Sequence, residues 1–135
     1  MRDWNRQGNI KEFVASVNGI RNENSALHHL TNICFLPADG DDILFYVKAS
    51  LDRSNVILAA VNLDPFQSHV HGHGAARGNW CCTGLVLHRV GVAPGEIYQV
   101  TDLLTGAVYM WRERNYVRLD PNIEPAHILR VEKPR

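Results

Sequence analysis

The sequence lacks any surplus of charge: 14 Lys and Arg residues balance 14 Asp and Glu residues. Domains that bind nucleic acid or an anionic membrane usually carry a basic surplus, so neither partner is expected. Long apolar runs are missing too, because residues 56–61 form one of the longest and are far too few to span a bilayer. No apolar signal-peptide core follows residues 1–6. The composition therefore predicts a cytoplasmic protein.

A disulfide framework is also missing. The sequence has three cysteines, Cys34, Cys81 and Cys82, and an odd number with one adjacent pair is poorly suited to disulfides. Neighbouring residues on a strand point to opposite faces, so Cys81 and Cys82 are expected in different environments. We interpret all three as reduced thiols of a cytoplasmic protein. The 135 residues still suffice for one domain with its own core.

One amphipathic helix is predicted near the N-terminus. Apolar residues recur there at helical spacing, and polar residues fill the opposite side. Asn9 is the expected N-cap, and Glu12 three residues later would complete a capping box. The apolar stripe of this helix consists of Ile10, Phe13, Val14, Val17 and Ile20.

After Thr31 the pattern changes to short strands separated by turn residues. Residues 43–49 and 55–63 predict one hairpin, and 55–63 is apolar on both faces, as in a central strand. Residues 97–101 and 107–112 predict a second hairpin, with Gly106 at positive φ. Further strands are expected at 32–36, 80–87, 115–119 and 126–131, and a loop at 66–79. The fold class is mainly β, an antiparallel β-sandwich of about seven or eight strands preceded by one amphipathic helix.

The sharpest local feature is an alternating histidine run, His69, His71 and His73. On an extended strand the three imidazoles would share one face and could bind zinc or nickel. A flexible polar loop with solvated histidines is the alternative, because glycines interrupt the run and no cysteine or carboxylate adjoins it.

The carboxylates do not form a catalytic pair in the sequence. Asp39, Asp41 and Asp42 cluster, but without the ligand spacing of a calcium loop, so they indicate a hairpin turn. Four further carboxylates each lie beside a turn residue, where such side chains cap turns. They offer no pair of general acid and nucleophile. They are Asp64, Asp102, Asp120 and Glu124.

Four aromatic residues, Trp80, Tyr98, Tyr109 and Trp111, could stack against sugar rings as a platform. The alternative is that strand aromatics of this kind pack in the core or between sheets. Their exposure decides between the two: coplanar exposed rings favour glucan binding, and buried rings oppose it.

Six segments, taken in order, carry a resemblance to a known family. They are 3–10 (DWNRQGNI), 17–27 (VNGIRNENSAL), 61–65 (VNLDP), 98–106 (YQVTDLLTG), 115–121 (NYVRLDP) and 125–129 (PAHIL). They span nearly the whole chain and resemble the C-terminal region of a bacterial subgroup of glycoside hydrolase family 13, the α-1,4-glucan:maltose-1-phosphate maltosyltransferases. Two departures are Gln7, where the family usually has proline, and residues 69–79, whose histidines therefore inherit no role.

The resemblance implies that residues 1–30 are the last helix of a (β/α)8 barrel and that residues 31–135 are the β-sandwich domain after it. In this family the nucleophilic Asp and the acid/base Glu lie upstream in the barrel. No catalytic, cofactor-binding or metal residue is therefore assigned here, and the chain by itself is expected to be no enzyme. Met1 within a family motif suggests a cloned fragment or a truncated gene.

The leading functional hypothesis is a structural accessory domain that caps and stabilises the catalytic barrel of its parent chain. The alternatives are a sandwich that binds α-glucan and a histidine-loop domain that binds metal. Without a barrel, the apolar stripe of the helix needs other cover. We expect the helix to fold back on the sandwich, anchored by Leu27 and Leu30, or to pair with a second copy in a homodimer.

Overall fold

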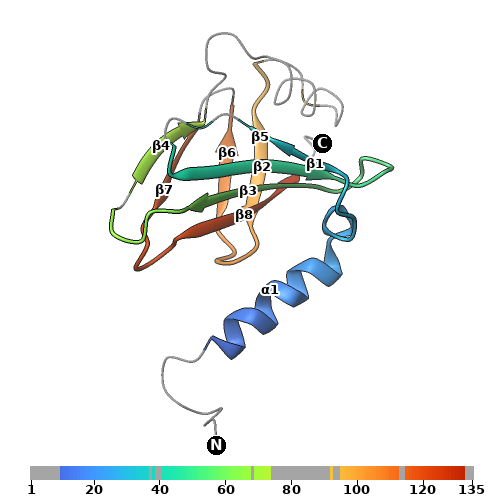
Figure 1. The fold of residues 1–135 in the computed structure, drawn as a ribbon. Coiled ribbons are helices and arrows are strands. Elements are labelled where there is room, and N and C mark those ends of the chain that lie inside the picture. Colours follow the sequence, from blue (N-terminus) through green and yellow to red (C-terminus); the bar gives the residue numbers. More distant parts are fainter. Residues whose placement is uncertain are drawn as a thin grey trace, which may run out of the picture.

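The computed structural model describes residues 10–36, 38, 41–67, 69–73, 92, 95–112 and 115–132, and of 69–73 the backbone alone. Figure 1 shows one helix, α1, that extends below an all-β body. The helical elements are α1 (Lys11–Glu23) and the short 3-10 turn η1 (Ser25–Leu27). The strands are β1 (Ile33–Phe35), β2 (Ile43–Ala49), β3 (Val56–Asn62), β4 (His69–His73), β5 (Tyr98–Asp102), β6 (Val108–Trp111), β7 (Asn115–Leu119) and β8 (Ala126–Glu132).

The strands form two antiparallel sheets. Six strands pair in the order β1-β2-β3-β8-β5-β6, and β4 pairs with β7 in a second sheet. Both predicted hairpins are confirmed, because β2 pairs with β3 and β5 with β6. The strand that is apolar on both faces, β3, lies inside the larger sheet, as predicted. Gly106, in the turn between β5 and β6, has φ 78° and confirms the predicted turn.

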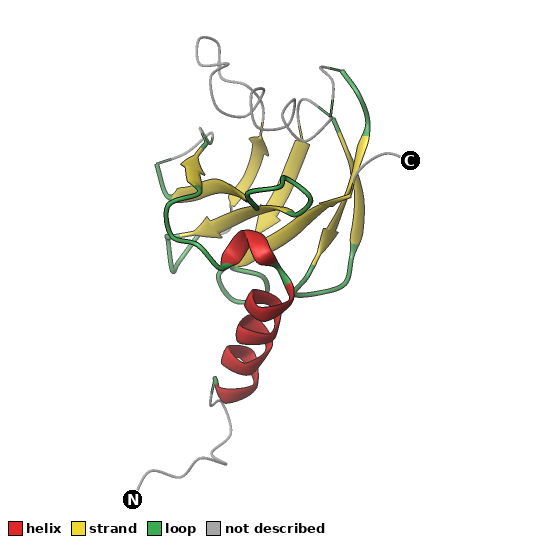
Figure 2. Cartoon of the chain, turned by 90° about the vertical axis from the view of Figure 1, so that its right-hand side faces the viewer, coloured by secondary structure: helices red, strands yellow, loops and turns green. Residues whose placement is uncertain are grey.

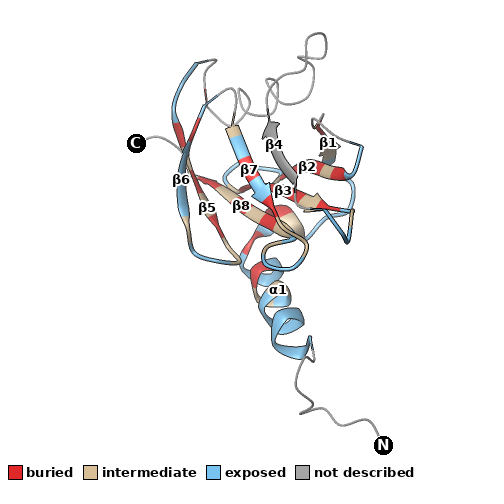
Figure 3. Ribbon diagram, turned by 90° about the vertical axis from the view of Figure 1, so that its left-hand side faces the viewer, coloured by how far each residue is buried: buried red, intermediate tan, exposed pale blue. Residues whose placement is uncertain are grey.

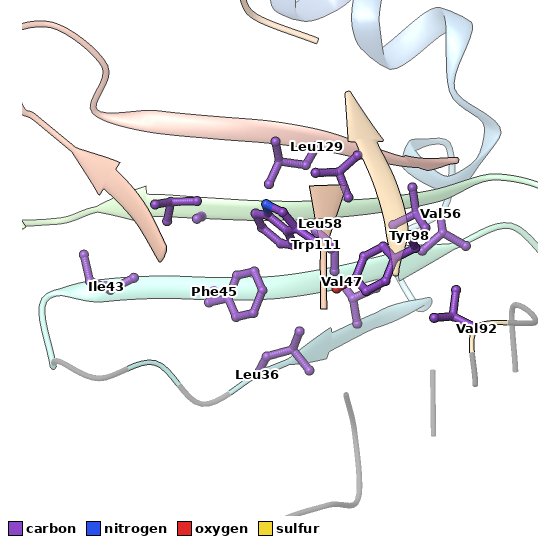
Figure 4. Close-up of a cluster of buried hydrophobic side chains, with 14 of the residues drawn as sticks. Leu36, Ile43, Phe45, Val47, Val56, Leu58, Val92, Tyr98, Trp111 and Leu129 are labelled. Carbon is purple, nitrogen blue, oxygen red and sulfur yellow. The ribbon is translucent and has the colours of Figure 1, made fainter. Parts of the chain in front are cut away.

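The hydrophobic core lies between the two sheets. Alternate residues of the six-stranded sheet point inward, and Phe45, Leu58 and Leu129 are among those buried in one cluster, shown in Figure 4. Val117 and Leu119 of β7 belong to the same cluster, so the smaller sheet covers the inner face of the larger one. Two sheets packed over a shared core are the predicted β-sandwich, and Figure 3 shows the buried positions recurring along its strands.

Helix α1 does not fold back on the sandwich. It joins the body at its C-terminal end through η1, which contacts β2 and β3, and the rest of the helix runs away from the sheets (Figures 1 and 2). The expected anchor Leu30 is 86% exposed. The fold-back expectation is therefore wrong, because polar contacts at the junction, described below, direct the helix outward.

Two local expectations also need correction. Residues 69–73, expected within a loop, form β4, because the backbone pairs with β7 from His69 opposite Leu119 to His73 opposite Asn115. A partner strand has outweighed the weak strand preference of its glycine. The helix begins at Lys11 after Ile10, without a side-chain cap. Asn9, the expected N-cap, lies outside the described residues, as does the strand expected at 80–87.

Candidate functional site

The end of α1 is fastened to the sandwich by two asparagines. Asn24, which is buried, follows the helix and donates from Nδ2 to the carbonyl of Ile20 over 2.8 Å. Its Oδ1 accepts a hydrogen bond of 3.0 Å from Nδ2 of Asn55, the residue before β3. Oδ1 of Asn55 in turn accepts from the N–H of Ala26 over 3.0 Å. This asparagine junction satisfies backbone groups left open where a helix ends.

Two more side chains extend the asparagine junction onto β2. Asn32 donates from Nδ2 to the carbonyls of Ala26 and Ala49, at 2.9 and 2.6 Å. The ammonium of Lys48 donates to the carbonyl of His29. Because these bonds come from separate segments, they hold the start of the sandwich and the end of the helix in one arrangement.

The apolar stripe of α1 begins at this junction and continues away from it. Ile20 is buried against the body, and Val17, one turn back, is half-buried. Further along the stripe, Phe13 is 54% exposed and Val14 45%, and Ile10 is more exposed still. Helical periodicity places Phe13, Val17 and Ile20 on one side of the helix. The side of α1 that meets the sandwich therefore continues as an uncovered apolar surface.

One row of residues across the outer face of the six-stranded sheet is apolar as well. The strand pairing places Phe35, Tyr46, Ala59 and Ile128 in one row across β1, β2, β3 and β8. Phe35 is 61% exposed and meets the ring of Tyr46 edge-on, with ring centroids 6.1 Å apart. An antiparallel sheet that faces water usually carries polar residues on its outer face. This face and the stripe of α1 are both surfaces suited to a partner.

The described part of the chain does not form a sugar-stacking platform from these aromatic residues. Tyr98 and Trp111 are buried and meet at 74° with ring centroids 6.4 Å apart. Burial also raises the pKa of Tyr98 to about 12. Tyr109 is exposed, and Trp80 lies outside the described residues. Two of the three described rings thus serve as core residues, which opposes the glucan-binding alternative.

The predicted turn carboxylates do cap turns. Oδ1 of Asp64 accepts from the N–H of Phe66 over 2.8 Å, and Oδ1 of Asp120 accepts from the N–H of Asn122 over 3.0 Å. Glu124 forms an isolated bridge with Asp120 across the turn before β8. These positions follow the preference of aspartate for turns.

The aspartate cluster before β2 also lies at a turn. Asp41 and Asp42 are exposed there, and the carbonyl of Asp42 accepts from the N–H of Leu63 over 2.7 Å. Asp39 is outside the described residues.

Asp102 does more than cap a turn. Its Oδ1 accepts from the N–H of Leu104 over 2.9 Å, and its Oδ2 lies 2.6 Å from Nδ1 of His127. Nε2 of His127 lies 3.0 Å from the carbonyl oxygen of Arg118. Both ring nitrogens are therefore engaged and both side chains are buried. An Asp–His pair closed in this way has no free nitrogen with which to take a proton from a substrate.

The roles of His127 and of the asparagines of the junction are not evident from the sequence pattern. A signal for His127 existed: in 126–131 it alternates with Leu129 and Val131, so a strand assignment places an imidazole at a core position. Such a histidine requires a buried partner, and only the fold shows that the partner is Asp102.

The histidine run lies on β4, at alternate positions opposite Leu119, Val117 and Asn115 of β7. Its side chains lie outside the structural description. Among the residues that are described, no group of three His, Cys, Asp or Glu side chains is placed to hold a metal ion. The metal hypothesis for His69, His71 and His73 stays a prediction. No helix in the described ranges combines the length and apolar character needed to cross a membrane.

Comparison with known proteins identifies sequence relatives across nearly the whole chain. The model of a family described as "GLGE, C-terminal" matches residues 35–131. The α-1,4-glucan:maltose-1-phosphate maltosyltransferase of Rhodospirillum rubrum is 43% identical over 131 residues, which are 96% of this chain and 18% of that protein. The proteins of the same name from Methylacidiphilum infernorum and Corynebacterium glutamicum are each 36% identical, over 97% and 91% of this chain and 18% and 17% of their own lengths.

A solved structure shares the fold. It is a crystal structure from Bacillus halodurans C-125 of a protein provisionally assigned as an alpha-N-acetylgalactosaminidase, with a TM-score of 0.50 and 14% identity. The match covers 76% of this chain and 21% of that one. In both comparisons the chain corresponds to a minor part of a much longer protein.

Proposed function

This chain belongs to the GLGE C-terminal family, and we propose that it is the non-catalytic C-terminal domain of a maltosyltransferase that acts on α-1,4-glucans. The resemblance found in the sequence is thereby confirmed at the level of the family. In the proposed arrangement residues 1–30 carry the last helix of the catalytic (β/α)8 barrel, and residues 31–135 form the sandwich that stabilises it. A cytoplasmic location is part of the same proposal.

The observation that carries this proposal is the uncovered stripe of α1. Fully burying an apolar side chain of the size of Phe13 or Val14 is worth about 1.5–3 kcal/mol relative to leaving it in water. An isolated helix of this length is marginal in water, yet α1 is fastened at the asparagine junction with the N-terminal part of its stripe, including Phe13 and Val14, uncovered. A helix of this kind is suited to pack against a larger apolar body, as the last helix of a barrel does.

The relatives' length supports the same partner. This chain spans about 18% of the Rhodospirillum rubrum protein, so most of that protein lies outside the matched region. The remaining part of the Rhodospirillum rubrum protein is a suitable binding partner with which to test the stripe, because that protein is 43% identical to this chain in the region where they match.

The test is reconstitution of an enzyme from two parts. The Rhodospirillum rubrum protein, lacking its matching region, is co-expressed with this chain, and association and transfer from maltose 1-phosphate to glycogen are measured. We expect a stable complex and activity well above that of either part. Val14→Asp, which places a charge in the stripe, should abolish both.

Ala15→Asp is the matched control, because it adds the same charge to the same helix on the side away from the stripe. It should leave association unchanged. Association that survives Val14→Asp would remove the stripe from the interface. Failure of the wild-type chain to associate, while it remains folded, would contradict the accessory function.

A further inference from the structure

The contacts of His127 join the two sheets of the sandwich. His127 lies on β8 and Asp102 on β5, both in the six-stranded sheet, whereas Arg118 lies on β7 in the two-stranded one. The ring thus lies between a carboxylate of one sheet and a backbone carbonyl of the other, at 2.6 and 3.0 Å. Asp102 and His127 are 0% and 4% exposed, so water cannot replace either contact readily.

Both atoms that flank the ring are hydrogen-bond acceptors when Asp102 is ionised. A carbonyl oxygen has no proton to give, so Nε2 of His127 must donate to Arg118. Nδ1 can be bonded to Asp102 only if a second proton lies between them, on the ring or on the carboxyl group. The arrangement therefore requires one proton more than a neutral histidine beside an aspartate.

Loss of that proton breaks one of the two bonds whichever nitrogen gives it up. A ring protonated only on Nε2 would turn a lone pair toward Asp102, and a ring protonated only on Nδ1 would turn one toward the carbonyl of Arg118. A buried acceptor facing another acceptor is strongly disfavoured.

We propose that Asp102, His127 and the carbonyl group of Arg118 form a proton-dependent clamp that holds β7 to the six-stranded sheet. The clamp is closed while the second proton is present and releases β7 when it leaves. It is a property of the sandwich itself and does not rest on the proposed enzyme.

The charged and titratable groups around the clamp favour its protonated form. The hydrogen bond that Nδ1 of His127 donates to Asp102 raises the pKa of His127 above its ordinary value despite burial, and the charge of Glu124 acts in the same direction. Burial opposes ionisation of Asp102, but its bonds with His127 and the N–H of Leu104 together lower its pKa.

The other neighbours leave this balance in place. Tyr109 of β6 lies near Asp102 and Glu124, and burial together with those two charges raises its pKa, so its hydroxyl stays neutral. The guanidinium of Arg118 turns away from the clamp to Asp120, 3.4 Å away, and is itself mostly exposed.

The pH range of the clamp follows from these directions. The raised pKa of His127 contributes stability that is fully present below pH 6.5. This stability is lost as the pH rises through the pKa of His127 in the folded state. The lowered pKa of Asp102 contributes stability that is fully present above pH 3.8. This stability is lost as the pH falls through the pKa of Asp102 in the folded state. The clamp is thus fully closed between pH 3.8 and pH 6.5.

The direct test is nitrogen NMR of the full chain labelled with ¹⁵N-histidine. We expect His127 to be mostly protonated on both ring nitrogens at pH 6.5, where a histidine with an ordinary pKa is only half protonated. His127→Gln identifies the signal. An unprotonated ring nitrogen of His127 below pH 6.5, together with a carboxyl ¹³C shift that shows Asp102 to be ionised, overturns the proposal, and this result does not depend on any variant folding.

Asp102→Asn tests the mechanism because it should reverse the direction in which stability changes with pH. The amide keeps an acceptor for Leu104 and offers a donor to Nδ1, so a neutral ring now satisfies both contacts. The denaturation midpoint of this variant should fall as pH decreases through 6.5, whereas the clamp makes that of the wild type fall as pH rises above 6.5.

Glu132→Gln is the matched control, because it neutralises a carboxylate that accepts from Arg130 at the surface, 2.9 Å away. It should keep the wild-type pH profile. Equal pH profiles for wild type and Asp102→Asn would contradict the clamp.

Discussion

Asn55 donates its side-chain N–H to the side-chain oxygen of Asn24, 3.0 Å away, and so ties the end of α1 to the start of β3 across 31 residues of sequence. The same Asn55 side chain accepts from Ala26 with its oxygen. One amide therefore holds both the helix end and the turn that follows it. This arrangement determines where the apolar stripe of α1 points.

Asn55→Ala should loosen this attachment. The change leaves the buried oxygen of Asn24 and the N–H of Ala26 without these partners, and an unsatisfied buried polar group costs about 1–3 kcal/mol. We expect a lower free energy of unfolding by that amount in urea denaturation. Asn122→Ala, at an exposed turn position, should change it by no more than about 0.5 kcal/mol. Equal effects of the two substitutions would contradict the role of the asparagine junction.

Gly106→Val should destabilise the β5–β6 hairpin. Gly106 has φ 78°, and no atom outside its chain neighbours lies within 4 Å of a Cβ built there. The effect is therefore one of backbone strain rather than of a clash, and a β-branched residue in that region costs about 1–3 kcal/mol. Thermal or urea unfolding measures it. Gly106→Asn is the control, because asparagine tolerates positive φ, and it should be milder. An unchanged midpoint for Gly106→Val would refute this reason.

The purified chain should be catalytically silent. In the described residues its turn carboxylates form no pair of nucleophile and general acid, because Asp64 and Asp120 cap turns and Asp102 is bonded to His127. We expect no release of phosphate from maltose 1-phosphate and no hydrolysis of starch or glycogen above a buffer blank. Phosphate release that follows this chain through successive chromatographic steps would overturn the prediction.

The stripe of α1 should promote self-association when no other partner is present. Phe13 and Val14 are exposed, and a two-fold pair of helices would bury the same face of each. Sedimentation at increasing concentration should show a dimer that Val14→Asp dissociates and Ala15→Asp does not. A wild-type chain that stays monomeric at every concentration would show that the stripe is not a pairing surface.

Local patterns in the sequence determined most of the elements. The heptad-like spacing of Phe13, Val17 and Ile20 specified a helix with one apolar side, and β-branched runs such as 43–49 specified strands whose bounds agree with the structure. These signals succeed because side-chain direction repeats with the period of the element itself. The turn at Gly106 was predictable for the same reason, since its positive φ is a local requirement.

Pairing between distant segments was decided by the tertiary structure alone. The strand nature of residues 69–73 depends on β7, more than 40 residues later, which supplies hydrogen bonds that no local pattern reveals. The outward course of α1 likewise depends on Asn55. His127 reads as an ordinary strand residue until the fold brings it within 2.6 Å of Asp102. The sequence by itself therefore determined most of the elements and the family, whereas the fold decided which polar groups meet in the core, because a buried hydrogen bond needs two partners in place at once.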